Sequence, residues 1–345
     1  MKLDVSHLRY MDADDFRILA ALEAGSRNHE HVPIELISKF TGIRPGGLRR
    51  KMADLARFRL FTFEPEGVRL GYGGYDYLAL NALLQRGSVV ALGNQIGVGK
   101  ESDIYLADTA EGECVVIKLQ RLGRTSFRTV KTNRDYHGKR QHTSWIYLSK
   151  LASQREWEFM GALWERGFPI PRPVDSSRHV VVMERIVGRR LDDFNRGEVE
   201  EEEARDWLRQ SLEMLTGLAK IGLVHGDLNE FNIMVQDAPP AAPGHRRLVM
   251  IDFPQMVSVK HQNARDYFER DYKGIISFFG RVFLIDADVI IDFEQILVES
   301  GGDAMIDDLC KASGYKHAQD GEDEGENEFA AHEEDNESEL ESVIE

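Results

Sequence analysis

An acid and an amide lie five residues apart in the apolar stretch LVHGDLNEFNIMV, residues 223–235. A carboxylate such as Asp227, directly after a strand-like run, can accept a proton from a hydroxyl group or orient a water molecule. The amide of Asn232 can hold a metal ion, and Asp252 in MIDFPQM can supply a carboxylate ligand to it. The pattern therefore indicates a metal-assisted reaction in which one acid handles a proton.

A glycine turn and a strand lysine precede these residues. In IGVGKESDIY, residues 96–105, the paired glycines allow the backbone to approach a phosphate closely, and Lys100 adds positive charge. The turn is neither a Walker A loop, because Ser or Thr does not follow the lysine, nor a Rossmann fingerprint, because a strand follows. Lys118 ends the β-branched run VVIK. Alone it would be read as an exposed edge lysine, but beside a glycine turn it can hold nucleotide phosphates.

Such a lysine needs an acidic partner, and the helix SQREWEFMGALWERG, residues 153–167, offers Glu156 and Glu158. Three, four and seven residues after Glu156 come apolar side chains, which are Phe159, Met160 and Leu163. The same positions after Glu158 hold Gly161, Ala162 and Glu165. Glu156 is therefore on the inward stripe. Because an inward carboxylate needs a counter-charge, we expect it to pair with Lys118.

A glycine loop, a lysine, an acid–amide pair and a metal carboxylate are the parts of a phosphoryl-transfer site. At this order and spacing, GVGKES, VVIK, HGDLNEFNIMV and IDFPQM resemble the RIO family of atypical serine/threonine protein kinases, over about residues 1–310. The N-terminal segment, the loop GRTSFRTVKTNRDYH and IDFPQMVS are similar to its second, winged-helix-bearing subfamily. The resemblance implies an α+β fold, with a winged helix-turn-helix domain before a bilobal kinase-like domain. It also implies ATP with Mg²⁺ or Mn²⁺, and late maturation of the small ribosomal subunit.

The resemblance also assigns roles by position. The residues it places at the nucleotide are Gly97, Gly99, Lys100, Ser102, Lys118, Glu156, Met183, Glu184 and Ile186, the last two acting through their backbone at adenine. The residues it places in catalysis are Lys118, Asp227 and Asp252, and the metal ligands are Asn232 and Asp252. His225 and Asn229 are expected to build the catalytic loop rather than to do chemistry.

The sequence departs from ordinary protein kinases after Asp252. The DFG motif has become Asp252-Phe253-Pro254, no APE follows, and Ser102 stands at the third loop glycine. Proline fixes φ, so we expect the segment to be restricted. Only about a dozen residues separate Asp252 from the next helical segment, which leaves little room for a peptide platform. We therefore expect ATP cleavage with water or Asp252 itself as acceptor, the latter forming an acyl phosphate. Hydrolysis would then switch association with the pre-ribosome.

The elements that position these residues follow from periodicity and turns. Helical patterns cover residues 12–24, a segment from Pro33 to Gly42, and residues 45–58, and a hairpin follows around residues 65–67. Three short helices and a hairpin fit a winged helix-turn-helix. We expect a winged helix domain over 1–75, a connecting helix over 76–92, a kinase N-lobe over 93–187, a C-lobe over 188–312 and a disordered acidic tail over 313–345.

Two basic segments indicate a polyanionic partner. The third helix and its flanks carry six basic residues and one acid between residues 44 and 59, among them Arg49, Arg50 and Lys51. The loop 121–142 holds seven Lys/Arg and one Asp, and its nucleic-acid candidates are Arg124, Arg128, Lys131 and Arg134. Such clusters bind phosphates in a salt-dependent way. The family resemblance implies the pre-small-subunit ribosomal particle as partner, with its rRNA and assembly factors. A solvated or protein-binding face is the alternative explanation of the charge.

Composition indicates the cellular compartment in which the protein works. The net charge is −16, but residues 320–345 contribute thirteen acids and no Lys/Arg, so the rest of the chain carries −3. Cys114 and Cys310 support neither a disulfide framework nor a thiolate zinc site, which fits a reducing compartment. No apolar run approaches the roughly 20 residues that span a bilayer, and the N-terminus has no apolar signal core. We expect a cytoplasmic monomer that can shuttle to the nucleus and does not bind membranes.

Four other functions stay open. A true Ser/Thr kinase of a ribosome-assembly partner would use the same residues. Small-molecule phosphotransferases also carry HGD with a following Asn and lack APE, but need neither a winged helix nor a basic loop. An assembly factor with a vestigial kinase fold is opposed by the filled catalytic positions. A DNA-binding regulator would use the winged helix alone.

Overall fold

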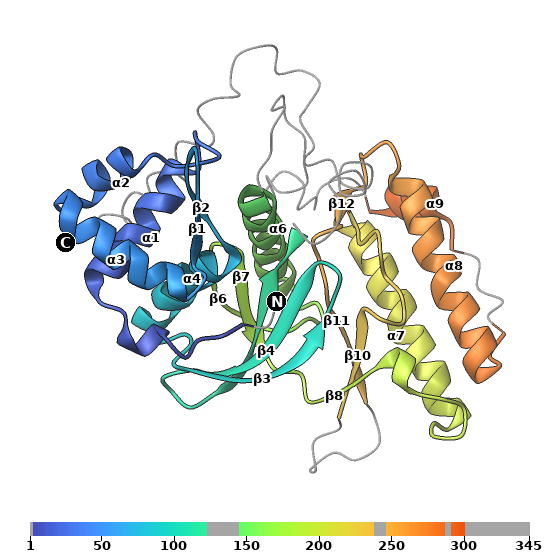
Figure 1. Ribbon diagram of the computed structural model, residues 1–345. Helices are drawn as coiled ribbons and strands as arrows, with labels where there is room; N and C mark the ends of the chain where they lie inside the picture. The colour runs from blue at the N-terminus through green and yellow to red at the C-terminus, as the bar shows by residue number, and fades with distance from the viewer. Residues whose placement is uncertain (1–2, 123–144, 238–245, 287–290, 301–345) are drawn as a thin grey trace. The chain divides into compact units, whose positions relative to one another are not determined.

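The computed structural model describes residues 3–122, 145–237, 246–286 and 291–300. The chain forms two compact units (Figure 1). Within the described residues, the first contains residues up to Leu92 together with Asp108–Glu111, and the second contains Gly93–Ala107 and the residues from Gly112 onward. The expected acidic tail and almost all of the basic loop, with Arg124, Arg128, Lys131 and Arg134, lie outside the described residues.

The first unit has the winged-helix order that the sequence predicts. Its helices are η1 (Leu8–Tyr10), α1 (Ala13–Gly25), α2 (Ile34–Thr41), α3 (Pro45–Arg57) and α4 (Tyr72–Gln85), and its strands are β1 (Phe61–Glu64) and β2 (Gly67–Leu70). A capping box between Asp12 and Asp15 starts α1, and Gly42, with φ 66°, ends α2. Helix α4 begins four residues before the expected helix, at Tyr72.

Buried apolar side chains join these helices to the hairpin. The core of the unit includes Ile18, Leu19, Leu22, Ile37, Leu48, Met52, Leu55 and Tyr75. Strands β1 and β2 pair antiparallel, with Phe61 opposite Leu70 and Glu64 opposite Gly67. The segment before α2 joins this hairpin through one antiparallel bridge between Val32 and Val68.

The first part of the second unit is a five-stranded sheet in the order β3-β4-β5-β7-β6. Its strands are β3 (Ala91–Val98), β4 (Ser102–Asp108), β5 (Cys114–Gln120), β6 (Pro173–Ser177) and β7 (Val180–Glu184). Helix α6 (Trp145–Glu165) packs on β5, β6 and β7, as Figure 1 shows. The alternating burial of β4, with Asp103, Tyr105 and Ala107 inside, is the period of two expected for a strand with one covered face.

The rest of this unit is mainly helical. Helices α7 (Glu201–Lys220) and α8 (Ala264–Phe283) pack side by side with α9 (Phe293–Glu299) around Trp207, Phe279 and Phe283 (Figure 1). The remaining elements are β8 (Gly188–Arg190), η3 (Leu191–Asp193), β9 (Leu223–Val224), β10 (Ile233–Gln236), β11 (Arg247–Met250) and β12 (Val257–Ser258). Winged helix followed by kinase-like lobes confirms the expected fold class. Among the helices that the structure describes, none combines the length and apolarity that a bilayer crossing requires.

Candidate active site

Two short antiparallel pairs bring the acid–amide loop next to Asp252. The loop between β9 and β10 carries Asp227 and Asn232, and the segment between β11 and β12 carries Asp252. Strand β9 pairs with β12, and β10 pairs with β11. The loop that carries Asp227 and the segment that carries Asp252 are therefore both flanked by paired strands, β9 with β12 on one side and β10 with β11 on the other. The backbone N–H of Ile251 also donates to the carbonyl of Asn232 at 2.9 Å. Register alone thus places Asp252 beside the acid–amide loop.

Lys118 and Glu156 form a buried ion pair. Nζ of Lys118, on β5, lies 2.6 Å from Oε1 of Glu156, on α6, and the two side chains are 8% and 1% exposed. The second carboxylate oxygen of Glu156 accepts a hydrogen bond from the side-chain amide of Gln120 at 2.7 Å. The structure therefore brings together the pair that the apolar stripe on α6 predicts. Gln120 completes the set from the same face of β5, two residues after Lys118.

Lys118 also reaches the metal-binding segment, since its Nζ lies 2.9 Å from Oδ1 of Asp252. Burial works to lower the pKa of Lys118, but the carboxylates of Asp252 and Glu156 outweigh it and raise that pKa. Lys118 is therefore a permanent cation between two acids. Asp252 is 45% exposed, so its carboxylate is accessible to a ligand. Its backbone has φ 69°, in the left-handed region that is uncommon for non-glycine residues.

Three side-chain amides hold the carboxylate of Asp227. Asn229 donates to its Oδ1 at 3.0 Å, and Asn232 and Gln255 each donate to its Oδ2 at 3.3 Å. Asn232 donates a second bond from the same nitrogen to the carbonyl of Asp227, at 2.9 Å. Because the nitrogen of Asn232 is used in this way, its amide oxygen remains for a ligand. Asp227 is therefore fixed in one orientation by neighbours from two segments.

The residues fit a hard divalent cation. The amide oxygen of Asn232 and the carboxylate of Asp252 are oxygen donors on adjacent segments, and Lys118 beside them is suited to phosphate. Magnesium is bound in proteins by one or two carboxylates together with substrate phosphates, and rarely by a complete protein cage. Such an ion would neutralise charge on the phosphates of a nucleotide held there.

The glycine turn joins β3 to β4 tightly. The N–H of Gly99 donates to the carbonyl of Ser102 at 2.7 Å. A Cβ atom on Gly99 would lie 3.3 Å from that same carbonyl oxygen, and one on Gly97 would lie 3.3 Å from Ile104. Glycine therefore allows the close turn at both positions. Lys100 is exposed at its tip.

The expected adenine-binding segment links the five-stranded sheet to the sheet of β8, β10 and β11. Met183 is buried in β7, and Glu184 ends that strand. The side chain of Glu184 accepts the backbone N–H of Arg172 at 3.1 Å, and its own N–H donates to the carbonyl of Arg172 at 2.9 Å. Ile186 lies in the connection between β7 and β8. These bonds engage one carboxylate oxygen and the backbone N–H of Glu184 within the unit.

His225 is a buried, neutral residue of the loop. Its ring is fully buried and lies 6.0 Å from the ring of Phe253. Burial lowers the pKa of His225 to about 4, although the charge of Asp252 and the backbone of Ile251 act in the opposite direction. The histidine is therefore uncharged at neutral pH and packs against Phe253, which is the loop-building role expected for it.

Asp271 on α8 binds the backbone of the loop between β9 and β10. No sequence pattern indicated this role. The Asp271 carboxylate accepts the backbone N–H of Gly226 at 2.9 Å, and the residue is 3% exposed. Burial raises the pKa of Asp271 to about 7, against hydrogen bonds from the backbone of Leu228 and Gly226. Sequence reasoning also missed Gln120 and Gln255. The period of two along β5 was a usable signal for Gln120, whereas α8 offers none for Asp271.

Replacing Asp271 with asparagine should change the pH dependence of stability. Between about pH 4 and 7 the folded protein keeps a proton on Asp271 that the unfolded chain releases. The contribution of Asp271 to stability therefore falls as pH rises through this range and is constant above it. The variant Asp271→Asn lacks this loss. The difference in unfolding free energy, variant minus unmutated protein, should therefore increase by at most about 4 kcal/mol between pH 4 and 8, at about 1.4 kcal/mol per pH unit. Urea unfolding at several pH values measures the difference, and a flat difference curve would contradict it.

In the first unit, the basic residues of α3 differ in exposure and in ion pairing. Arg49 and Arg50 are exposed. Nζ of Lys51 lies 2.7 Å from Oδ2 of Asp12 and 3.1 Å from Oδ1 of Asp15, so its charge is already paired at the start of α1. Lys51 was expected to contact nucleic acid with its neighbours. Lys51 is 28% exposed and shares its charge with these acids, so Arg49 and Arg50 are the candidates on this helix whose charge is more available.

Comparison with known proteins decides the family. A model of the RIO domain matches residues 103–296, and a model of the N-terminal domain of Rio2 matches residues 8–86. The chain belongs to the RIO family of atypical serine/threonine protein kinases. Both matches together place it in the second, winged-helix-bearing subfamily, as the sequence motifs predicted. This RIO kinase therefore combines a Rio2 N-terminal domain with a RIO domain.

Relatives of this RIO kinase extend over most of the chain. It is 44% identical to the serine/threonine-protein kinase RIO2 of Caenorhabditis elegans, over 91% of this chain and 57% of that protein. It is 43% identical to rio2 of Schizosaccharomyces pombe, over 92% of this chain and 90% of that protein. A crystal structure of the Rio2 kinase–ADP/Mg²⁺–phosphoaspartate complex from Chaetomium thermophilum matches with a TM-score of 0.80 and 38% identity, over 99% of both chains.

Proposed function

We propose that this RIO kinase is an ATPase that uses Mg²⁺ and passes the γ-phosphate of ATP through an aspartyl phosphate on Asp252. The observation that carries the proposal is the position of Asp252. Its carboxylate is accessible, is held 2.9 Å from the permanent cation Lys118 and sits on a left-handed backbone. The Chaetomium relative, named as a complex with ADP, Mg²⁺ and phosphoaspartate, supports the same chemistry.

The reaction would proceed in two displacements. A carboxylate oxygen of Asp252 attacks the γ-phosphorus, the bond from that phosphorus to the β–γ bridging oxygen breaks, and ADP leaves. Lys118 stabilises the negative charge on the phosphate oxygens during this step. Water then attacks the phosphorus of the acyl phosphate, and inorganic phosphate and the free carboxylate of Asp252 are formed. Asp227, fixed by Asn229, Asn232 and Gln255, is the group placed to orient this water and take its proton.

The short segment after Asp252 favours Asp252 or water over a protein hydroxyl as acceptor. Helix α8 begins at Ala264, and β12 occupies two of the residues between. Phe253 and Met256 are buried, and the N–H of Met256 donates to the carbonyl of Phe253 at 3.1 Å. Core packing and a turn therefore engage much of the segment between Asp252 and Ala264. Few residues remain there to bind a peptide with its hydroxyl group in line with the phosphate.

Steady-state turnover of ATP without any added protein tests this function. Release of inorganic phosphate in step with ADP, over many turnovers, is the result we expect. Phosphate release that begins only when a protein substrate is added, with label on Ser or Thr of that substrate, would identify an ordinary protein kinase. ATP binding without turnover would favour an assembly factor that uses the nucleotide only as a ligand.

We infer that the cellular partner is a maturing small ribosomal subunit, and that hydrolysis favours release from it. The basic surface of α3 supports binding to its rRNA, because Arg49 and Arg50 are exposed and lie on the helix that winged-helix proteins commonly use for nucleic acid. Binding of this kind is driven by phosphate contacts and falls with salt.

The double variant Arg49→Gln/Arg50→Gln should weaken binding to small-subunit rRNA fragments and flatten its salt dependence. Each phosphate that the variant no longer neutralises should reduce the slope of log affinity against log salt by about 0.7–0.9. Lys39→Gln, which removes an exposed charge from α2, is the matched control and should change the affinity little. Fluorescence anisotropy at several salt concentrations measures both. An unchanged slope in the double variant would remove α3 from the RNA interface.

A further inference from the structure

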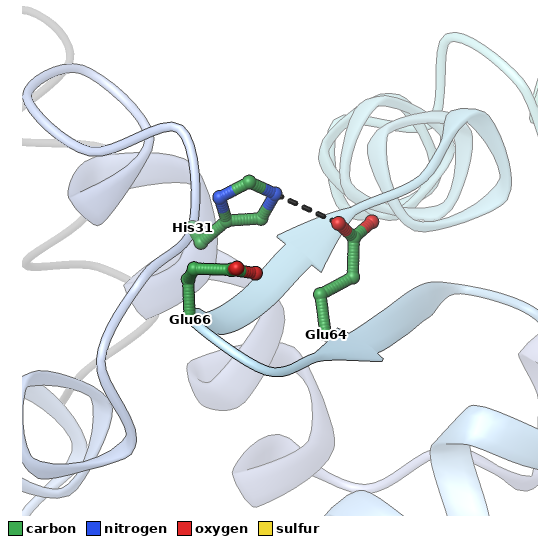
Figure 2. Close-up of side chains that lie close together, drawn as sticks. All are labelled: His31, Glu64 and Glu66. Atoms are coloured by element: carbon green, nitrogen blue, oxygen red, sulfur yellow. Dashed lines mark ion pairs between the residues drawn. The ribbon is translucent and has the colours of Figure 1, made fainter.

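Three side chains outside the kinase site converge at the tip of the wing in the first unit. His31 comes from the segment before α2, Glu64 ends β1, and Glu66 lies in the turn to β2. One nitrogen or oxygen atom from each lies within 4.8 Å of the other two. Figure 2 shows one ring nitrogen of His31 facing the carboxylate of Glu64, with the carboxylate of Glu66 below the imidazole in this view. The three residues are distant from the residues of phosphoryl transfer in sequence and belong to the other unit.

The backbone fixes these residues without help from a ligand. The N–H of Val32 donates to the carbonyl of Val68 at 2.8 Å, and the N–H of Val68 returns a bond to Val32 at 2.9 Å. Gly67, with φ 152°, allows this approach, because a Cβ atom there would lie 2.7 Å from the carbonyl oxygen of Val32. His31 is therefore held against the turn that carries Glu66, and a site formed by these residues would be pre-organised.

The environment of His31 Nε2 is a further observation about this cluster. Nε2 lies 2.9 Å from Oε2 of Glu64, yet the nitrogen is buried and makes no hydrogen bond within the described part of the chain. Two atoms that each bind a tetrahedral zinc ion at about 2.0–2.2 Å lie about 3.4 Å from one another. Nε2 of His31 and Oε2 of Glu64, which lie 2.9 Å apart, would therefore move apart by about half an ångström to bind one such ion together.

The remaining contacts orient the carboxylate of Glu64 and leave the carboxylate of Glu66 available to a ligand. Thr62 donates to Oε1 of Glu64 at 3.4 Å, and Arg69 approaches the same oxygen at 3.9 Å. This turns Oε2 toward His31, as outer partners orient metal ligands in general. Glu66 is exposed, and it has no ion pair or hydrogen bond among the residues that the structure describes. Two carboxylates thus lie close together with a single distant guanidinium to balance them.

We propose that His31, Glu64 and Glu66 bind a divalent transition-metal ion of the zinc class. One imidazole nitrogen and two carboxylate oxygens suit zinc better than magnesium, which prefers oxygen ligands alone. A water molecule would complete four-coordination. The ion would tie the segment before α2 to the wing and so stabilise the winged-helix unit, since a ligand that binds the folded state alone stabilises it by mass action.

Titration of the full, untagged chain with Zn²⁺ tests the site. The chain is first stripped with a chelator and then titrated calorimetrically at neutral pH with excess Mg²⁺ present to compete at the kinase site. We expect one zinc site per chain, weakened at least about tenfold in Glu66→Gln and in His31→Gln, because each variant removes one of three ligands. Glu35→Gln removes an exposed carboxylate on α2 outside the cluster and should bind as the unmutated protein does.

Thermal unfolding separates a metal site from a simple His–Glu ion pair. Zinc should raise the melting temperature of the unmutated chain and of Glu35→Gln, but not that of Glu66→Gln. Glu66 is exposed, so its replacement should leave the metal-free fold intact. Zinc binding with equal affinity in all variants, or no binding by the unmutated chain, would overturn the proposal. Either result would leave the ATPase function unaffected, because neither depends on Asp252.

Discussion

Asp227→Ala should slow the release of phosphate from ATP by about 10²–10⁴-fold, the usual contribution of a general base. The structure gives the reason, because three amides hold the Asp227 carboxylate in a single orientation beside Asp252. Alanine removes the group that orients the attacking water and accepts its proton. Single-turnover measurement of phosphate release at saturating ATP isolates this step from nucleotide binding.

Asn229→Ala provides the comparison for Asp227. Asn229 touches Asp227 Oδ1 at 3.0 Å, but two other amides remain on the carboxylate when it is replaced. We therefore expect a smaller rate loss than in Asp227→Ala, with ATP affinity little changed in both variants. A change below about threefold in Asp227→Ala would remove Asp227 from the role of general base.

Lys118→Met should abolish most activity and also destabilise the fold. Lys118 is the cation expected on the phosphate oxygens, and loss of one such group commonly lowers kcat by about 10²–10³. Its removal also leaves Glu156 as an unpaired acid at 1% exposure. Breaking a buried pair in this way costs about 3–5 kcal/mol of unfolding free energy. Phosphate release and urea unfolding, measured on the same preparation, report the two effects.

The double variant Lys118→Met/Glu156→Gln separates those effects. Glutamine at position 156 removes the unpaired charge and still accepts the hydrogen bond from Gln120. Most of the lost stability should therefore return, whereas activity should not, because no cation faces the phosphates. Recovery of activity in the double variant would contradict the role of Lys118, and unchanged stability in Lys118→Met would contradict the buried ion pair.

The sequence predicted the parts of this site that depend on local periodicity. The stripe Phe159, Met160, Leu163 on α6 distinguished Glu156 from Glu158, and the structure places Glu156 2.6 Å from Lys118. Helix and hairpin order likewise predicted the winged helix, because glycine and proline mark the ends of its short elements. The close approach of Asp252 to the acid–amide loop also followed from motif order, although its cause is the pairing of β9 with β12 and β10 with β11.

The remaining contacts join residues far apart in the chain, and no local pattern encodes them. Lys51 pairs with Asp12 and Asp15 at the start of α1, about 36–39 residues earlier in the chain. Asp271 reaches the loop from 45 residues away, and Gln255 reaches Asp227 from 28 residues away. His31 and Glu64 meet only because the Val32–Val68 bridge joins their segments. Such pairs depend on tertiary packing, which sequence periodicity does not report.

The chemical form of protein-bound phosphate tests the central claim most directly. The chain is incubated with γ-labelled ATP and Mg²⁺ without any other protein, quenched in acid, and treated with alkali or hydroxylamine. We predict label on the protein that both reagents release, as expected of an acyl phosphate, and no such label in Asp252→Asn. Alkali-stable label on Ser or Thr, or hydroxylamine-sensitive label that persists in Asp252→Asn, would contradict an aspartyl phosphate on Asp252.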